Sequence, residues 1–322
     1  MKQLNATIRL RHDRGLTLIE LMVSMVIGLI LMIAVVATYL GASGAGRASE
    51  AQGRMNEDAQ AALGILAQQL RMAGDNPKRS NYQSAAPRNP VYVAGTYAVR
   101  GCDGKFSDIT TAASIQALTC DAGGGAAADS IAISYEADGF NTVATSGGAA
   151  TDCLGNSLPV VPAVPQPQMW DGTAVVLATG ITYTVADNRF YIATSDAIKS
   201  PSLYCKGSGN ATPQPLVENV EDLQLTYGIA KSDSATPDVA GYLNAAGIVA
   251  NADLSLLADN VRWSKVITAR ICVVMRSDLP VVTDAVSAQY TKCNGEKETS
   301  PPDLRLRRAY STTVVLRNRA AL

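Results

Sequence analysis

The stretch "RGLTLIELMVSMVIGLILMIAVVATYL", residues 14–40, decides how this chain is organised. Glu20 is its only charged side chain after Arg14, and the apolar part from Leu16 to Leu40 contains 25 residues. A helix of that length rises about 37 Å, which exceeds the ~30 Å hydrocarbon core of a bilayer. The stretch therefore predicts a membrane-spanning helix over residues 16–40.

The flanks of this helix predict its orientation. Four basic residues precede it: Lys2, Arg9, Arg11 and Arg14. The positive-inside rule then puts residues 1–15 in the cytoplasm and the chain after Leu40 outside it. A secretory signal peptide fits poorly, because its apolar region is only ~7–15 residues long and ends in an A-x-A-like site. We expect a single-pass anchor.

Glu20 is the feature that a plain anchor does not explain. One interpretation is a carboxylate that snorkels to the lipid headgroups, where the cost of a charge is small. The other requires a cut after Gly15, which would give Leu16 a new α-ammonium one helical turn from Glu20. At an effective dielectric of ~20, such a pair ~4 Å apart gains about 4 kcal/mol before desolvation. An amine of a neighbouring copy would serve equally well.

A basic leader ending in glycine, followed by "LTLIE" and a long apolar helix, resembles the class III signal of type IV pilins and type II secretion pseudopilins. The resemblance implies that a prepilin peptidase cleaves between Gly15 and Leu16 and methylates the new amine of Leu16. It also implies that Glu20 helps the subunit to dock in a helical filament. The residue after the cut is usually Phe in this family, and Leu16 is another apolar residue.

Beyond residue 40 the sequence predicts an amphipathic extension, residues 41–76. "GASGAG" at 41–46 is expected to interrupt the helix, since glycine costs about 1 kcal/mol in a helix interior. Gly74 is the expected C-cap, with Pro77 beyond it. The apolar residues recur at spacings of three or four, which indicates a face that packs on a soluble domain: Met55, Ala59, Ala62, Leu66 and Leu70.

The remainder, residues 77–322, reads as strands and turns. The β-branched and aromatic runs lie at 91–99, 130–136, 173–179, 181–185, 189–195, 265–277 and 310–317. "ADNR" at 186–189 is interpreted as a hairpin loop between two of them. The whole chain is therefore expected to be α+β, with a long helix packed on an antiparallel β-sheet head domain.

Three further stretches narrow the family. "LAQQLRMAGDN" (66–76), "QPLVENVEDLQLTYG" (214–228) and "LRLRRAYSTTVVLRNR" (304–319) resemble the PilW-type minor pilins of type IV pili, which are close relatives of the J-type pseudopilins. Within the second stretch, one row of residues is expected to face the core: Val217, Val220, Leu223, Leu225 and Tyr227.

The cysteines indicate an oxidising compartment. All six follow the anchor, and an even count there predicts disulfides: Cys102, Cys120, Cys153, Cys205, Cys272 and Cys293. Six cysteines allow 15 pairings. Sequential pairing closes the shortest loops and is the pairing we consider first. A metal site is the alternative, but the chain has no CxxC and its single histidine, His12, lies in the leader.

Several function classes fit poorly. Without a histidine beyond residue 15, Ser-His-Asp and Cys-His catalysis are impossible, and no G-x-x-x-x-G-K-[ST] loop is present. Glu218, Glu221 and Asp222 are close enough for paired carboxylates but are interpreted as a solvated turn. The 27 basic and 28 acidic residues create no field for nucleic acid. The basic residues near the C-terminus are interpreted as a solvated strand face: Arg305, Arg307, Arg308, Arg317 and Arg319. We expect no cofactor, no metal and no catalysis.

The resemblance implies a minor pilin that helps to initiate, prime or cap the type IV pilus. Expected partners are other minor pilins, the major pilin, the prepilin peptidase, the inner-membrane assembly platform and membrane lipid. The chain would lie in the inner membrane with its N-terminus cytoplasmic and its bulk periplasmic, and then in the pilus at the cell surface. Three alternatives stay open: a type II secretion pseudopilin, a tip adhesin using loops between 80 and 210, and a membrane-tethered enzyme.

Overall fold

A computed structural model shows two compact units, residues 1–50 and residues 51–322. The structure describes residues 15, 17–76, 97–121, 127–162, 168–170, 172–177, 180, 182–210, 212–231, 238–254 and 256–318.

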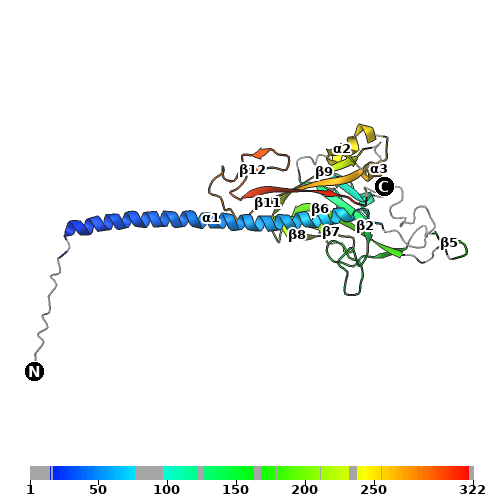
Figure 1. Ribbon diagram of the computed structural model, residues 1–322, viewed down its shortest axis with the longest axis horizontal. Helices are drawn as coiled ribbons and strands as arrows, with labels where there is room; N and C mark the ends of the chain where they lie inside the picture. The colour runs from blue at the N-terminus through cyan, green and yellow to red at the C-terminus, as the bar shows by residue number, and fades with distance from the viewer. Residues whose placement is uncertain are drawn as a thin grey trace, which may run out of the picture. The chain divides into compact units, whose positions relative to one another are not determined.

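Helix α1 runs from Leu18 to Met72, 55 residues without a break (Figure 1). The prediction that residues 41–46 interrupt the helix is wrong, because all six positions are helical. Glycine lowers helix propensity without forbidding the helix, and propagation from an existing helix needs no new nucleus. Side chains also bond along this turn, since Ser43 Oγ donates to the Leu40 carbonyl at 3.0 Å.

Within residues 51–322, the C-terminal part of α1 belongs to the hydrophobic core. The predicted stripe is confirmed, with Met55, Ala59, Ala62, Leu66 and Leu70 all at most 2% exposed. The helix ends as expected, because Gly74 takes a left-handed φ of 71°. The Gly74 amide then donates to the Ser134 carbonyl at 2.9 Å, which joins the helix end to a strand. Pro77 lies outside the described residues.

One side of the core is a six-stranded antiparallel sheet in the order β1-β2-β6-β7-β8, with β3 also paired to β6. The strands are β1 (Val99–Cys102), β2 (Ser130–Ala137), β3 (Val160–Pro162), β6 (Thr182–Thr194), β7 (Pro201–Lys206) and β8 (Gln214–Glu218).

The hairpin expected at residues 186–189 is wrong, because these residues lie inside the single strand β6. Their turn-forming side chains are satisfied by tertiary contacts. Asn188 is fully buried and donates to Gln69 Oε1 of α1 at 2.8 Å. Arg189 forms a buried ion pair with Asp187 at 2.9 Å and donates to the Ile109 carbonyl. Residues that favour turns in isolation can continue a strand when their polar groups are paired.

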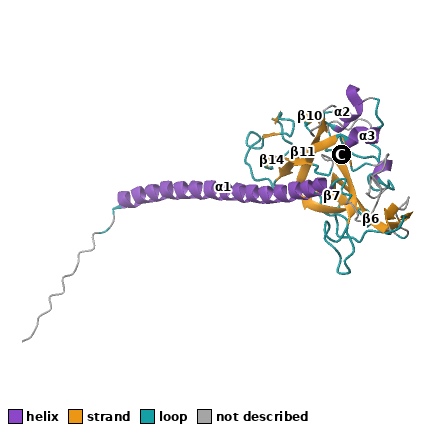
Figure 2. Ribbon diagram, turned by 45° about the vertical axis from the view of Figure 1, so that its right-hand side comes forward, coloured by secondary structure: helices purple, strands orange, loops and turns teal. Residues whose placement is uncertain are grey.

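The other side of the core is a four-stranded antiparallel sheet in the order β10-β9-β11-β14. Its strands are β9 (Val220–Ala230), β10 (Val239–Leu243), β11 (Val266–Arg276) and β14 (Arg307–Val315). The predicted core row from Val217 to Tyr227 is buried at every position, which confirms it. Figure 2 shows β11 and β14 beside the end of α1, and Tyr310 of β14 donates to Asn56 Oδ1 at 2.5 Å.

Short elements complete the head. They are η2 (Ile115–Ala117), α2 (Ala245–Ala250), η3 (Ala252–Leu254), α3 (Asp259–Ser264) and the two-stranded pairs β4 (Gln168–Trp170) with β5 (Val175–Leu177) and β12 (Tyr290–Thr291) with β13 (Lys297–Glu298). The strand expected at 91–99 falls largely outside the described residues, which resume at Tyr97. A long helix packed on antiparallel sheets confirms the α+β class.

The six cysteines form three disulfides in the sequential order. The pairs are Cys102 with Cys120, Cys153 with Cys205, and Cys272 with Cys293. The first joins the end of β1 to a loop, the second joins a loop to β7, and the third joins β11 to the loop after β12. The disulfides therefore fasten long connections to the sheets at three separate places.

Candidate functional site

The expected processing site lies just before α1. Gly15 is exposed, has no regular secondary structure and has no contact that a side chain there would disturb. Leu16, the residue expected to follow the cut, lies outside the described residues. The helix begins at Leu18, so Gly15 stands outside it.

Thr17 and Glu20 form a reciprocal cap at the helix start. The Thr17 amide and hydroxyl both donate to Glu20 Oε2, at 2.9 and 3.0 Å. In return the Glu20 amide donates to Thr17 Oγ1 at 3.3 Å. The Leu21 amide bonds the Thr17 carbonyl as the first helical bond. This is the capping box, in which residue one and residue four of S/T-x-x-E satisfy each other's backbone amides. The carboxylate of Glu20 also lies where the helix dipole favours negative charge.

The helix that follows exposes a continuous apolar surface. Large apolar side chains from Leu18 to Leu40 are 47–79% exposed. An 18-residue window of α1 has a mean hydropathy of 2.7 and no buried residue, which gives it the length and composition to cross a membrane. So much bare apolar surface needs lipid or other apolar helices as its surroundings.

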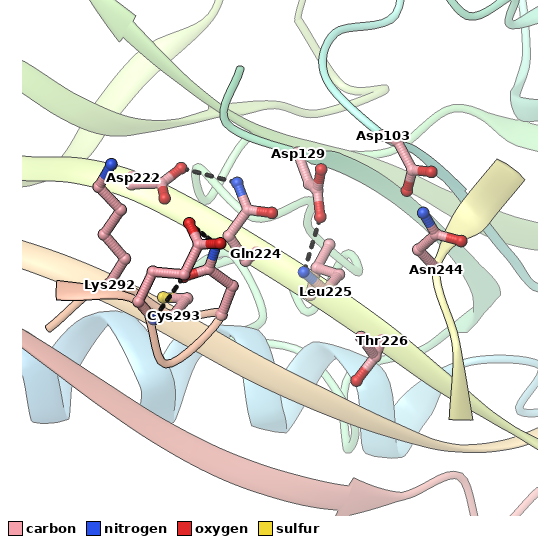
Figure 3. Close-up of a pocket in the computed structure, with 11 residues that line it drawn as sticks. Asp103, Asp129, Asp222, Gln224, Leu225, Thr226, Asn244, Lys292 and Cys293 are labelled. Atoms are coloured by element: carbon pink, nitrogen blue, oxygen red, sulfur yellow. Dashed lines mark hydrogen bonds between the residues drawn. The ribbon is translucent and has the colours of Figure 1, made fainter. Parts of the chain in front are cut away.

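The head contains an acidic cavity of about 420 Å³ (Figure 3). It lies over the outward-facing side chains of β9 and under the loop that follows Tyr290. Its lining residues are Asp103, Asp129, Asp222, Gln224, Leu225, Thr226, Asn244, Lys292, Cys293, Asn294 and Glu296.

The carboxylates of this cavity are occupied by the protein's own donors. Asp129 accepts from the Leu225 amide at 2.7 Å and the Gly104 amide at 3.1 Å. Asp103 accepts from the Ala245 and Ala246 amides at 2.9 and 3.0 Å. Burial raises the pKa of Asp129 to about 7, and the two amide donors only partly oppose the rise. The acids thus hold loops and strands together.

The carboxylates considered for paired catalysis are not brought together. Glu221 bonds Arg307 Nε at 2.7 Å, whereas Asp222 accepts from Gln224 Nε2 at 3.0 Å. Glu218 is exposed at the end of β8. Among the residues that the structure describes, no group of three or more His, Cys, Asp or Glu could hold a metal ion.

The prediction that the basic residues near the C-terminus form a solvated strand face is wrong for Arg307. This residue is 4% exposed and its guanidinium pairs with both Glu221 and Asp303, the latter at 2.6 Å. Two acidic partners and a further donor bond to the Arg305 carbonyl make its burial tolerable. Arg308 and Arg317 are exposed as expected, and Arg319 lies outside the described residues.

Two notable residues, Thr17 and Asp129, are not among those predicted from the sequence. Thr17 carried a usable signal, because "TLIE" at 17–20 matches the S/T-x-x-E capping pattern immediately before an apolar run. Asp129 carried none, since its burial depends on β9 and on the turn at Gly104, both distant in sequence.

Two family models match the chain. Residues 10–36 match the prokaryotic N-terminal methylation motif, and residues 189–318 match the type IV pilus-assembly protein W family. Among solved structures, a type IV-like pilin from Thermus thermophilus is similar over 83% of this chain and 97% of that chain, with 11% identity and a TM-score of 0.36. No curated protein matches the sequence.

The first match covers the end of the leader and most of the apolar helix segment, and the second runs from within β6 to the residues just after β14. These segments include the last six residues of the leader, "LTLIE", the 214–228 stretch and nearly all of the 304–319 stretch, whereas the 66–76 stretch lies outside both matches. The two matches, which together cover just under half of the chain, indicate a type IV pilin-like minor subunit of the PilW type.

Proposed function

We propose that this chain is a membrane-inserted precursor, cut between Gly15 and Leu16, that joins other minor pilins and the major pilin in a complex which initiates, primes or caps the type IV pilus. The family is one of structural pilins that interact with other pilus components. The N-terminal methylation motif and the apolar helix indicate a membrane-anchored pilin. Catalysis has no part in the proposal.

The observation that most strongly supports this proposal is the exposed apolar surface of α1, with one carboxylate near its start. Lipid covers such a surface before assembly, and helices of other subunits cover it in a filament. Glu20 is the single charge between Gly15 and Arg47. A new ammonium at Leu16, its own or that of a neighbouring subunit, would give this charge a partner and set the register between helices.

The proposed topology follows from the same segment. Residues 1–15 are a cytoplasmic leader, residues 16–40 span the inner membrane or fill the filament core, and residues 41–76 extend the helix. Residues 77–322 form the periplasmic head that later reaches the cell surface. The prepilin peptidase and the assembly platform are the proposed membrane partners.

The first test concerns processing. Mass spectrometry of the cell-derived protein should give an N-terminus at methylated Leu16. Gly15→Val should leave an uncut precursor in the membrane, because a peptidase that selects glycine at the cut would reject a β-branched side chain. A mature start at any other residue, in cells with active peptidase, would refute the proposal.

The second test separates the charge of Glu20 from its capping role. Glu20→Gln keeps an oxygen acceptor, and Gln also occupies the fourth position of capping boxes. If charge pairing directs docking, Glu20→Gln should remain in the membrane yet fail to enter sheared pili, as should Glu20→Ala. Normal incorporation of Glu20→Gln would show that the charge is not needed.

The match to a pilus-assembly family favours the pilus over type II secretion. Deletion of the gene should therefore abolish pili and twitching motility and leave enzyme export intact. Loss of export with normal pili would assign the chain to a secretion system.

A further inference from the structure

Asp129 occupies one edge of β9 in the place of a strand. On the edge of β9 that faces away from β11, the described partner strand β10 pairs only from Tyr227 onward. Before that point the Asp129 amide donates to the Leu223 carbonyl at 2.7 Å, and Asp129 Oδ2 accepts from the Leu225 amide at 2.7 Å. Residues two apart in a strand present their backbone groups to the same edge, so one aspartate meets both.

These bonds join the two sheets of the head. Asp129 directly precedes β2 of the six-stranded sheet, whereas Leu223 and Leu225 belong to β9 of the four-stranded sheet. The other carboxylate oxygen of Asp129, Oδ1, accepts from the Gly104 amide at 3.1 Å, just after β1. The Leu225 and Gly104 amides are therefore direct reporters of this junction, since each is released when the carboxylate leaves it.

The junction is buried and its surroundings are mostly acidic. Asp129 is 5% exposed, and Figure 3 shows its carboxylate directed at the Leu225 amide. Asp103 and Asp222 line the same cavity, and their charges oppose a negative charge on Asp129. Lys292, the cation of the described lining, forms an ion pair with Glu298 at 2.7 Å.

The other groups near the junction add no positive charge. Glu296 is a further acid of the cavity lining. The Tyr227 hydroxyl stays neutral, because burial holds its pKa well above the usual value of 10. Residues 122–126, which lead toward Asp129, are only alanine and glycine in the sequence. An ionised Asp129 is thus stabilised chiefly by its two backbone donors.

We propose that Asp129 is a proton-dependent latch between the two sheets: the closed junction takes up a proton on this carboxyl, the open junction releases it to water, and the junction therefore loosens as the pH rises. The inference goes beyond the proposed function, because it concerns the head alone and requires neither processing nor assembly. It gives the head a part whose opening responds to the pH of the surroundings.

The size of the effect follows from the difference between the closed and open states. Burial raises the pKa of Asp129 from 3.8 to about 7 in the closed junction, and a solvated carboxyl has its ordinary value. Below about pH 4 both states hold the proton, and well above pH 7 neither does. Between pH 5 and pH 7 the equilibrium constant for opening should therefore rise about 50-fold.

The experiment is hydrogen exchange of the full chain in detergent at pH 5, 6 and 7, read at single amides by mass spectrometry and corrected for intrinsic exchange rates. The Leu225 and Gly104 amides should lose protection about 50-fold from pH 5 to pH 7. They should also exchange faster than amides in the middle of β11 and respond little to low urea concentrations, because a local opening exposes little surface.

Two substitutions separate this carboxyl from other acids. Asp129→Asn keeps the shape and cannot ionise, so protection at Leu225 should change less than about twofold over the same pH range. Asp152→Asn is a matched control, because Asp152 is also buried and its two oxygens accept from the Leu154 and Gly209 amides, each at 2.9 Å. It should keep the full response at Leu225.

Three results would overturn the inference. The first is wild-type protection at Leu225 and Gly104 that does not change between pH 5 and pH 7. The second is an unaltered pH response in Asp129→Asn. The third is exchange at these amides with the rate and urea dependence of β11, since the junction would then open only with the whole head. If Asp129→Asn does not fold, the wild-type measurements still decide. The cut at Gly15 and entry into pili are measured separately, so the proposed function stands or fails independently.

Discussion

Aliphatic side chains of the same type are exposed in one of the two units of this molecule and buried in the other. In residues 1–50, large apolar side chains of α1 are mostly exposed, as with Leu29 at 64%. In residues 51–322 the same helix contributes Leu66 and Leu70, which are fully buried between strands of the head. Residue type alone therefore does not say what an apolar position is for.

The pattern around each apolar residue makes the distinction. Residues 18–40 are apolar on every face of the helix, which suits a uniform apolar solvent. Residues 51–72 place their apolar residues on one stripe and charged residues such as Glu57 and Asp58 elsewhere, which suits one protein surface. The apolar surface of residues 18–40 is left for other molecules to cover, whereas the apolar stripe of residues 51–72 is buried in the protein's own fold.

The largest effect is expected from the disulfide that closes the longest loop. Cys153 and Cys205 are 52 residues apart, and the chain-entropy relation gives about 4 kcal/mol for such a loop. The double substitution Cys153→Ser with Cys205→Ser should lower the free energy of unfolding of the head by that order, measured by urea titration of detergent-solubilised protein. Removing Cys102–Cys120, only 18 residues apart, should cost less, about 3 kcal/mol.

Both double mutants should still be retained in membranes, because their anchoring surface lies in residues 18–40. Loss of membrane retention, or an equal cost for the two disulfides, would contradict this division of roles.

A pair of identical substitutions in one helix tests the comparison directly. Leu66→Ala should destabilise the head by about 2–5 kcal/mol, because it removes buried methyl groups from a packed core. Leu29→Ala should change head stability by less than about 0.5 kcal/mol, because its side chain is outside that core. Tryptophan fluorescence reports the unfolding, since Trp263 is buried. Equal effects at the two sites would show that the two units are coupled in stability.

Much of this architecture was accessible from sequence where local pattern and final environment agree. The apolar run, the stripe from Met55 to Leu70 and the buried row from Val217 to Tyr227 each follow one periodicity. The strands β2 and β11 were found for the same reason, since each is a run of β-branched and apolar residues.

The errors arise where distant residues decide. No residue near Asn188 in the sequence indicates that Gln69 will accept a proton from its side-chain amide, so "ADNR" was interpreted as a turn. The burial of Arg307 depends on Glu221, 86 residues away. Strand β7 was missed because "PSLYCK" begins with proline and serine, and proline is tolerated at the first position of a strand. At the N-terminal site, the glutamate was recognised and its threonine partner was not.

The head should respond to pH through Asp129, whereas no such buried acid is described in residues 18–50. Its pKa rises from a usual 3.8 to about 7, so the folded head holds a proton that the unfolded chain releases above about pH 4. This stabilising contribution is fully present below pH 4 and is lost as the pH rises through 7. The slope is at most about 1.4 kcal/mol per pH unit for one proton.

Asp129→Asn should flatten the dependence of head stability on pH between 4 and 7, as measured by urea titrations at several pH values. Asp303→Asn is the control, because hydrogen bonding to Arg307 lowers the pKa of Asp303. That contribution is present above the usual pKa and lost at lower pH, so the control should alter only the acid side of the curve. If the stability of the Asp129→Asn head still falls between pH 4 and 7, groups other than Asp129 are responsible for the pH dependence.

The smallest effect is expected at the single hydrogen bond from Tyr310 of β14 to Asn56 of α1. Tyr310→Phe removes the hydroxyl and keeps the ring, so the head should lose about 1 kcal/mol, the net worth of a typical hydrogen bond. Because β14 is an edge strand of its sheet, this bond is one of the polar links that hold the amphipathic part of α1 against the head. Hydrogen exchange should show faster exchange of amides around residue 56 in Tyr310→Phe. Exchange that is unchanged there would mean that the buried stripe alone fixes the helix, and that polar bonds at the sheet edge add nothing to the difference between the two parts of α1.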